Sequence, residues 1–255
     1  MIANELRLFR IALQFLTRLP IASITDLPPD WLARCAKYMP LVGALVGAIA
    51  GGVILVAAVI FPEPLPVIIG LAIAIALTGA LHEDGLADTA DAFGGGRTRE
   101  RRLEIMRDSR IGTYGTLALI VALALKAAAL IPLDHMSAVY VLIAGHAGAR
   151  LAAVLTLCML SHASDGATKV SEKTSEMTLP EIAVAIALGL IPGLLLLQSA
   201  TFMISMIFAF AASAAVALMA KRRIGGYTGD VLGAVEQIFE TTFFIFAAAV
   251  ISGPG

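Results

Sequence analysis

The chain has 255 residues, of which 59% are hydrophobic and only 15% are charged. Soluble proteins contain roughly 45–50% apolar and 25% charged residues. The apolar residues here form long uncharged runs, so the composition excludes a water-soluble globule and predicts an integral membrane protein. The formal net charge of −1 excludes a chain whose overall charge drives binding to nucleic acid. Two cysteines provide neither a disulfide framework nor a cysteine zinc site.

Residues 5–19 carry arginines at helical spacing among apolar residues. They resemble a signal peptide in length, but no small-residue cleavage site follows them. We expect a helix that lies flat in the membrane interface, with a re-entrant segment as the alternative.

Seven later stretches are long and apolar enough to cross a bilayer, since a spanning helix needs about 20 such residues. They are predicted near residues 40–61, 64–82, 112–133, 138–160, 180–199, 201–220 and 233–252. Almost nothing separates the fifth stretch from the sixth, so a merged pair is the alternative. The expected fold is an all-α, polytopic membrane helix bundle of about seven transmembrane helices plus the N-terminal interfacial amphipathic helix. A single membrane-embedded domain is expected over residues 1–255.

The Lys and Arg residues outside the predicted spans all fall on one side of the membrane. Segments 1–39, 83–111, 161–179 and 221–232 contain sixteen of them, and the connections on the other side contain none. Connections rich in Lys and Arg stay in the cytoplasm. In a bacterial-type inner membrane, the N-terminus and residues 83–111 are therefore expected in the cytoplasm and the C-terminus on the outer side.

The densest group of polar residues, 82–96, comes directly after the second predicted span. If the helix continues through it, Asp84, Asp88 and Asp91 lie at positions i, i+4 and i+7 and share one face. Three carboxylates held together repel one another unless a cation neutralises them. Mg²⁺ prefers oxygen ligands and keeps positions free for water and substrate phosphate. The spacing predicts a metal site, with a solvated acidic loop as the alternative.

Two further polar segments lie in the connections on the basic side. Arg107 and Arg110 are one turn apart beside Asp108, and the planar guanidinium suits bidentate contact with phosphate. Positive-inside topology alone accounts for these arginines equally well. Residues 225–230 contain three glycines and end at Asp230, which is typical of a loop whose N–H groups approach an anion, or of a simple turn.

Ionisable residues also occur inside the predicted spans, where they are costly and normally face the bundle interior or a wet cavity. They are Lys126, His146, Arg150, Glu236 and Glu240. The two glutamates are expected to pair with the Arg or the Lys. Structural ion pairing and a direct role in function both remain open at this point.

These segments together resemble the adenosylcobinamide-GDP ribazoletransferase family, also called cobalamin synthases. The resemblance runs from about residue 9 to residue 240. It is carried, in chain order, by residues 15–20, 39–43, 82–91, 103–112 and 225–230.

The resemblance implies an Mg²⁺-dependent enzyme of the inner membrane that performs the last assembly step of the vitamin B12 nucleotide loop. In that step a ribose hydroxyl of α-ribazole, or of its 5′-phosphate, attacks the cobinamide-side phosphorus of adenosylcobinamide-GDP and expels GMP. The expected partners are therefore the corrinoid nucleotide, α-ribazole and membrane lipid, and no nucleic acid. The sequence does not specify the oligomeric state.

For this reaction Asp84, Asp88 and Asp91 are expected to hold Mg²⁺ and to act in catalysis. Phosphoryl transfer needs charge neutralisation and alignment more than covalent chemistry by the protein. The proton of the attacking hydroxyl is expected to pass to a carboxylate that is free of the metal, or to His82.

Five further residues are expected to bind substrate. Arg107 and Arg110 would hold the diphosphate, and Arg150 would contribute from within the membrane. Asp108 and Asp230 are candidates for substrate contact or for additional metal ligands.

Two other functions are compatible with parts of the sequence. The acidic motif resembles more loosely that of membrane CDP-alcohol phosphotransferases, although Ala87-Asp88 stands where that family has an Ala-Arg pair. A secondary transporter is the other alternative, because buried ionisable residues are typical of transporters. Against a transporter, the richest polar group lies at the predicted cytoplasmic boundary and no inverted repeat is visible.

Overall fold

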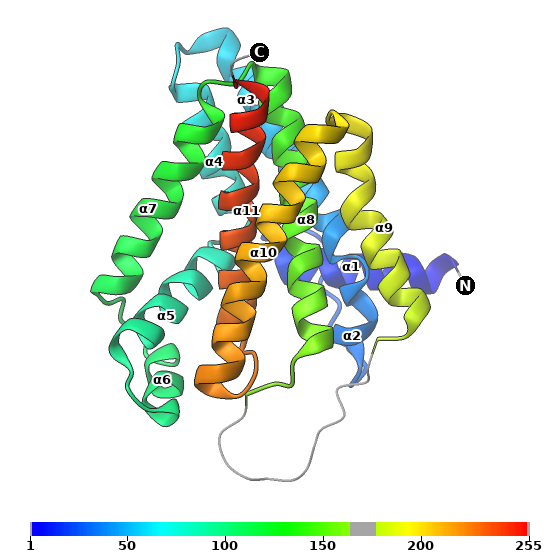
Figure 1. The fold of residues 1–255 in the computed structure, drawn as a ribbon. Helices are drawn as coiled ribbons and strands as arrows, with labels where there is room; N and C mark the ends of the chain where they lie inside the picture. Colours follow the sequence, from blue (N-terminus) through cyan, green and yellow to red (C-terminus); the bar gives the residue numbers. More distant parts are fainter. Residues whose placement is uncertain (1, 164–176, 254–255) are drawn as a thin grey trace.

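The computed structural model describes residues 2–163 and 177–253. In this part of the chain the regular structure is helical, with eleven α-helices and no strand longer than an isolated bridge. Most of the helices run along one axis and form a bundle (Figure 1). The all-α expectation is confirmed.

Six helices are long and apolar enough to cross a membrane, and a seventh span results if α4 and α5 are counted together. The six are α3 (Met39–Ile60), α7 (Thr113–Leu130), α8 (His135–Met159), α9 (Leu179–Leu196), α10 (Ser199–Ile224) and α11 (Gly229–Ile251). Because α9 and α10 are separate helices, the fifth and sixth predicted spans are distinct. The predicted number of spans is confirmed when the α4–α5 pair is included.

The second predicted span is broken where the sequence suggested one continuous helix. α4 (Leu65–Thr78) ends and α5 (Leu81–Gly95) begins at an angle of 86° to it. Gly79 and Ala80 both adopt left-handed backbone conformations, with φ of 64° and 59°. Two such residues in succession end a right-handed helix and redirect the chain. The acidic motif therefore lies on a helix of its own, α5.

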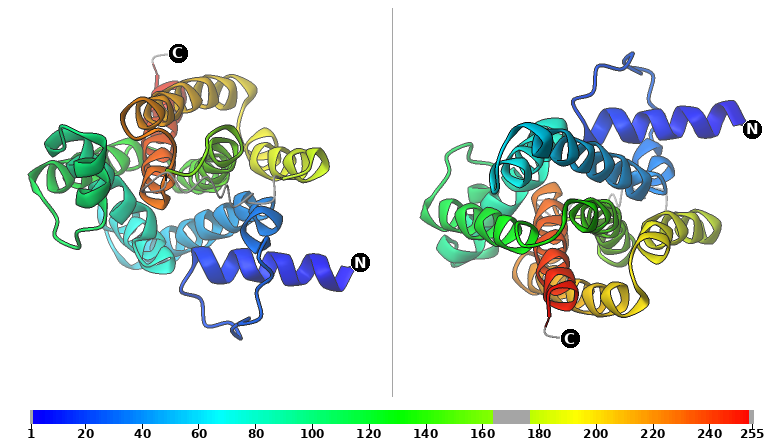
Figure 2. Two further views of the ribbon diagram at one scale, coloured as in Figure 1. Left: turned by 90° about the horizontal axis from the view of Figure 1, so that it is seen from below. Right: turned by 90° about the horizontal axis from the view of Figure 1, so that it is seen from above.

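The bundle is built around α8, which Figure 2 shows enclosed by α3, α9, α10 and α11. Small residues allow the close contacts: a Cβ atom on Gly47 of α3 would lie 2.6 Å from the carbonyl oxygen of Leu142 in α8. Close approach of backbones is a common way for membrane helices to associate. As a result, polar side chains on α8 are covered by protein and do not face lipid.

The N-terminal helix α1 (Ile2–Leu16) runs across the long axis of the bundle (Figures 1 and 2). It buries Leu8 and Ile11 and leaves Arg7 and Arg10 on its polar side. The side chain of Gln14 holds the following segment through two hydrogen bonds to the backbone of Ile24. This orientation agrees with the predicted interfacial helix, which ends three residues earlier than expected. A short helix, α2 (Trp31–Ala36), then leads to α3.

Two connections rich in arginine lie at one end of the bundle, called here the basic end. It includes α6 (Arg99–Met106), between α5 and α7, and the turn between α10 and α11. The C-terminal end of α11 lies at the opposite end (Figure 1). These two connections and the C-terminus are thus at the opposite ends that the distribution of Lys and Arg predicts, and which end faces the cytoplasm stays a prediction.

The role of Gly79 in the bend between α4 and α5 can be tested by substitution. A Gly79→Ala variant would place its Cβ 2.5 Å from Nε of Arg18 and would force an L residue into the left-handed region, at a cost of about 1–2 kcal/mol. Ala80→Gly removes a strained residue at the same bend. In detergent, thermal unfolding should begin at a lower temperature for Gly79→Ala and at an equal or higher one for Ala80→Gly. Wild-type stability of the first variant would show that the bend is not held at Gly79.

Candidate active site

The outer face of α5, called here the acidic face, carries Asp84, Asp88 and Asp91, the acidic residues predicted from the sequence to lie together. Asp84 is exposed, Asp88 is half-buried and Asp91 is buried, while the two residues before Asp84 point into the protein. The negative charges of Asp84, Asp91 and Asp230 all act on Asp88. The structure therefore gathers the three predicted carboxylates of α5, and a fourth from α11, in one electrostatic neighbourhood.

Asp230 reaches this neighbourhood because α5 and α11 touch at two glycines. A Cβ on Gly85 would lie 2.7 Å from the carbonyl oxygen of Asp230 and 3.1 Å from the Cα of Gly233. A Cβ on Gly233 would in turn lie 3.1 Å from the carbonyl oxygen of His82. Only residues without side chains allow the backbones of α5 and α11 to come this close, so the two glycines bring Asp230 beside the acidic face.

Residues 225–230 form the turn that delivers Asp230. Gly225, with φ of 87°, ends α10. The Thr228 hydroxyl accepts a hydrogen bond from the backbone N–H of Val231 at 3.2 Å and so caps α11. A Cβ added to Gly229 would meet no atom within 4 Å. The segment is thus a turn between two helices, and anion binding by its backbone stays a prediction.

Asp91 has a role that the sequence analysis missed. Its carboxylate accepts hydrogen bonds from the backbone N–H groups of Gly112 at 2.6 Å and Gly115 at 2.9 Å. These are unpaired donors at the start of α7, where a negative charge is favourable. Two glycines three residues apart at a predicted helix start were the available signal. Asp91 therefore ties α5 to α7, and its predicted role as a metal ligand stays a prediction.

The donor set on the acidic face suits a hard divalent cation. Among residues 2–163 and 177–253, no three His, Cys, Asp or Glu side chains converge closely enough to hold a metal by themselves. Mg²⁺ does not require such a group, because it usually takes one or two carboxylates and completes its shell with water and substrate phosphate. Asp84, Asp88 and Asp230 fit a site of that kind.

The predicted phosphate-binding arginines lie in the connection between α6 and α7. The Arg110 guanidinium contacts both carboxylate oxygens of Asp108, with Nε–Oδ1 of 3.0 Å and Nη2–Oδ2 of 2.6 Å. This guanidinium lowers the pKa of Asp108 to about 2. The Arg110 side chain is 86% exposed, so its fork is accessible. Arg107, also exposed, follows the last residue of α6.

Other arginines in this region hold the helices together. Nε of Arg99 donates to the carbonyl oxygen of Ile224 at 2.9 Å, and Arg102 donates to that of Arg223 at 3.1 Å. Arg223 donates in turn to the carbonyl oxygen of Phe93 at 2.6 Å. Cations at the C-terminal carbonyls of a helix are stabilising. These arginines therefore fix α6 and the end of α5 to the end of α10, beyond any effect on membrane orientation.

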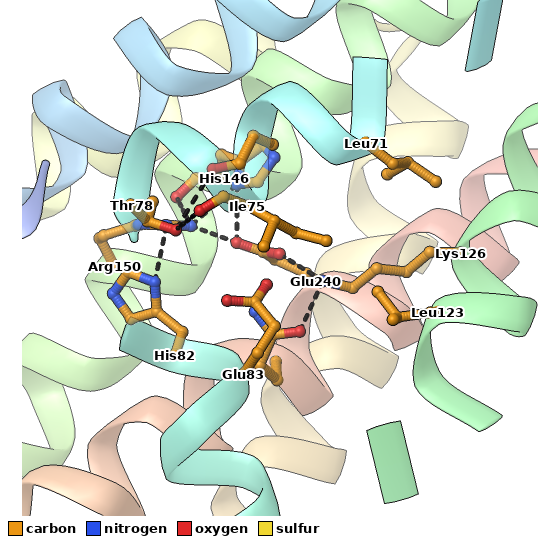
Figure 3. Close-up of a pocket in the computed structure, with 12 residues that line it drawn as sticks. Leu71, Ile75, Thr78, His82, Glu83, Leu123, Lys126, His146, Arg150 and Glu240 are labelled. Carbon is orange, nitrogen blue, oxygen red and sulfur yellow. Dashed lines mark hydrogen bonds and ion pairs between the residues drawn. The ribbon is translucent and has the colours of Figure 1, made fainter. Parts of the chain in front are cut away.

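Behind the acidic face lies a buried network of ionisable side chains from α5, α7, α8 and α11 (Figure 3). Arg150 forms ion pairs with Glu240 and, through Nε at 3.1 Å, with Glu236. Nζ of Lys126 lies 2.6 Å from Oε2 of Glu240. The predicted pairing of these glutamates with Arg150 and Lys126 is confirmed. A small cavity among these groups has room for about one water molecule.

Two predicted site residues belong to this network. His82 is 3% exposed, with Nε2 at 3.0 Å from Oε2 of Glu236 and Nδ1 at 3.3 Å from Arg150. Arg150 is 1% exposed. Both side chains point into the network rather than toward Asp84. Their catalytic and substrate-binding roles stay predictions, while their part in the network is a property of the fold.

Comparison with known proteins identifies the family of this chain. Residues 8–248 match the family described as cobalamin-5-phosphate synthase. An adenosylcobinamide-GDP ribazoletransferase of Leptothrix cholodnii is 40% identical over 253 residues, covering 95% of each chain. Proteins of the same name from Shewanella amazonensis and Bradyrhizobium diazoefficiens are each 39% identical, the latter over 99% of this chain and 97% of its own. No solved structure matches the chain. The match over nearly the whole length shows that the chain belongs to the cobalamin-5-phosphate synthase family.

Proposed function

We propose that this enzyme joins adenosylcobinamide-GDP to α-ribazole, or to α-ribazole 5′-phosphate, and releases GMP. The observation that carries the proposal is the gathering of Asp84, Asp88 and Asp230 at the basic end, in a chain whose relatives are named adenosylcobinamide-GDP ribazoletransferase. A ribose hydroxyl oxygen forms a bond to the cobinamide-side phosphorus, and the bond from that phosphorus to the oxygen of GMP breaks. The hydroxyl proton passes to a protein carboxylate.

The acidic face is the proposed site of Mg²⁺. One or two of Asp84, Asp88 and Asp230 would supply oxygen ligands, with water and substrate phosphate completing the shell, and Asp91 is a further predicted ligand, one turn beyond Asp88. When bound, the cation neutralises the diphosphate and the charge that develops during transfer. The protein's own contribution is to hold the carboxylates together against their mutual repulsion.

A carboxylate of the acidic face is the better candidate for the proton acceptor. Asp84 is exposed and can meet a substrate hydroxyl. His82 already contacts Glu236 and Arg150 inside the protein. A general base must come within hydrogen-bond reach of the proton that it takes, and this favours a carboxylate over His82.

The basic connections would bind the diphosphate of the substrate. Arg110 is paired with Asp108 on the surface, where such ion pairs contribute little to stability. The diphosphate, with its larger charge, would displace Asp108 and accept the same bidentate contact. Arg107 lies three residues earlier and is the second proposed phosphate ligand.

The basic end is proposed to face the cytoplasm of a bacterial-type inner membrane. A reporter that is active only in the cytoplasm should work when fused after Gly95 and fail when fused to the C-terminus, because Lys and Arg retain their connections in the cytoplasm. Reporter activity in intact cells is the measurement. Activity of the C-terminal fusion would contradict both the seven-span count and the orientation.

The metal proposal predicts that Asp84→Asn or Asp88→Asn reduces GMP release by on the order of 10²–10³-fold, the effect of losing one electrostatic contact to a transition state. Release of GMP by purified protein at limiting Mg²⁺ is the measurement. Asp26→Asn is the control, because Asp26 is fully exposed and only loosely paired with Arg7 at 3.5 Å. Near-normal turnover by either active-site variant would remove that residue from the metal site.

The phosphate proposal predicts that Arg110→Lys keeps the charge and the topology but loses the fork. A charge-assisted contact of about 1.5–3 kcal/mol corresponds to a roughly ten- to hundredfold decrease in kcat/KM for adenosylcobinamide-GDP. Arg101→Lys is the matched control, since Arg101 is exposed on α6 and pairs only one turn away with Glu104. Equal kinetics for the two variants would leave Arg110 with a role in topology alone.

A further inference from the structure

The acidic residues are held by the same two helices that meet again one turn deeper in the membrane. There, Nε2 of Gln237 on α11 donates to Oε1 of Glu83 on α5 at 3.0 Å. Gln237 is 2% exposed and Glu83 is 9% exposed. The proposed metal ligand Asp84 is the next residue after Glu83. The buried contact and the acidic face are therefore consecutive along α5.

Gln237 needs both halves of its amide. While Nε2 donates to Glu83, Oε1 accepts a hydrogen bond from Nζ of Lys126 on α7 at 2.7 Å. A carboxylate at this position could only accept, and an apolar side chain could do neither. Glu83 and Lys126 point toward Glu240 in the same buried space (Figure 3). The amide thus links a cation of α7 to an anion of α5 through α11.

The spacing along α11 connects this link to the acidic face. Asp230 precedes Gln237 by seven residues, which is about two helical turns, so the two lie on the same side of α11. Between them, Gly233 touches Gly85. A shift of α11 along α5 that broke the contact between Gln237 and Glu83 would also move Asp230 relative to Asp84.

A contribution to stability does not by itself account for the hydrogen bonds that join Lys126, Gln237 and Glu83. Buried charged networks are often no more stabilising than well-packed apolar residues of similar volume, and their best attested benefit is a defined register. At membrane depth such groups are costly. The apolar faces of α5 and α11 could slide past each other, whereas the hydrogen-bonded link allows one register.

We propose that Gln237 and Glu83 are positioning residues that set the register of α5 against α11, and thereby the affinity of the acidic face for a divalent cation. The inference rests on the proposed function, because it concerns the residues that fix the geometry of the proposed metal site. Both residues would act through the helices that carry Asp84 and Asp230.

The test is the binding of Mn²⁺, as a paramagnetic stand-in for Mg²⁺, to the purified full chain in detergent, measured by electron paramagnetic resonance. Gln237→Glu places a second carboxylate against Glu83 and should weaken Mn²⁺ binding about ten- to hundredfold, as loss of supporting contacts around a metal site does. Glu83→Gln should have little effect, because its amide oxygen still accepts from Gln237. The double variant restores one donor and one acceptor and should return the affinity to near the wild-type value.

Two further variants separate positioning from folding. Phe202→Ala removes a buried side chain that packs on Gly193 of α9, so it should lower the unfolding temperature and leave Mn²⁺ affinity unchanged. Gln237→Met keeps the length of the side chain without adding charge, and serves if Gln237→Glu does not fold. It should also bind Mn²⁺ more weakly.

The outcomes distinguish this inference from the function on which it rests. If the wild type and Asp84→Asn bind Mn²⁺ equally, the proposed metal site fails and the positioning role fails with it. If Asp84→Asn loses binding but Gln237→Glu and Gln237→Met keep wild-type affinity, only the positioning role is overturned. It is overturned as well if the double variant binds as weakly as Gln237→Glu.

Discussion

The contact between α5 and α11 at Gly85 and Gly233 is the constraint on which the rest of the site depends. Because neither residue has a side chain, the two backbones come close enough for side chains of α5 and α11 to meet on either side of this contact. Toward the basic end, Asp230 joins the carboxylates of α5. Toward the middle of the membrane, His82 and Glu83 meet Glu236 and Gln237. A larger residue at either position would separate both pairs of partners together.

The buried network is possible because α8 occupies the centre of the bundle. Arg150 and His146 lie on that helix with almost no exposed surface. The glycines of α3 let its backbone cover α8 closely, so lipid does not reach the charges. Ionisable groups that would be very costly in hydrocarbon are instead surrounded by partners of opposite charge.

The number and approximate limits of the spans could be predicted from the sequence, because each requires about 20 apolar residues. The bend at Gly79 and Ala80 could not, since nothing about Ala80 in the sequence indicates a left-handed conformation. For the same reason the acidic motif was expected at the end of a straight span rather than on a helix of its own.

For the site, spacing on one helix was enough to group Asp84, Asp88 and Asp91. The partners of the site residues could not be predicted, because they depend on contacts between distant segments. Asp91 meets the start of α7, and His82 meets Glu236 of α11. The link through Gln237 had no signal at all, since a glutamine in an apolar span specifies neither what it donates to nor what it accepts from.

The shortness of α4 has a consequence for how the chain crosses the membrane. Its 14 residues extend about 21 Å at 1.5 Å per residue, well below the roughly 30 Å thickness of the hydrocarbon layer. α4 alone therefore does not cover this layer, and the chain turns by 86° into α5, which continues the span. Polar backbone at such a break is tolerated only where protein covers it. Because α5 leads from the end of α4 to α6 at the basic end (Figure 1), the acidic face lies on the half of the broken span that approaches that end. A span in two pieces thus lets a carboxylate-bearing helix cross the bundle at a steep angle to the others, which a single straight helix could not do.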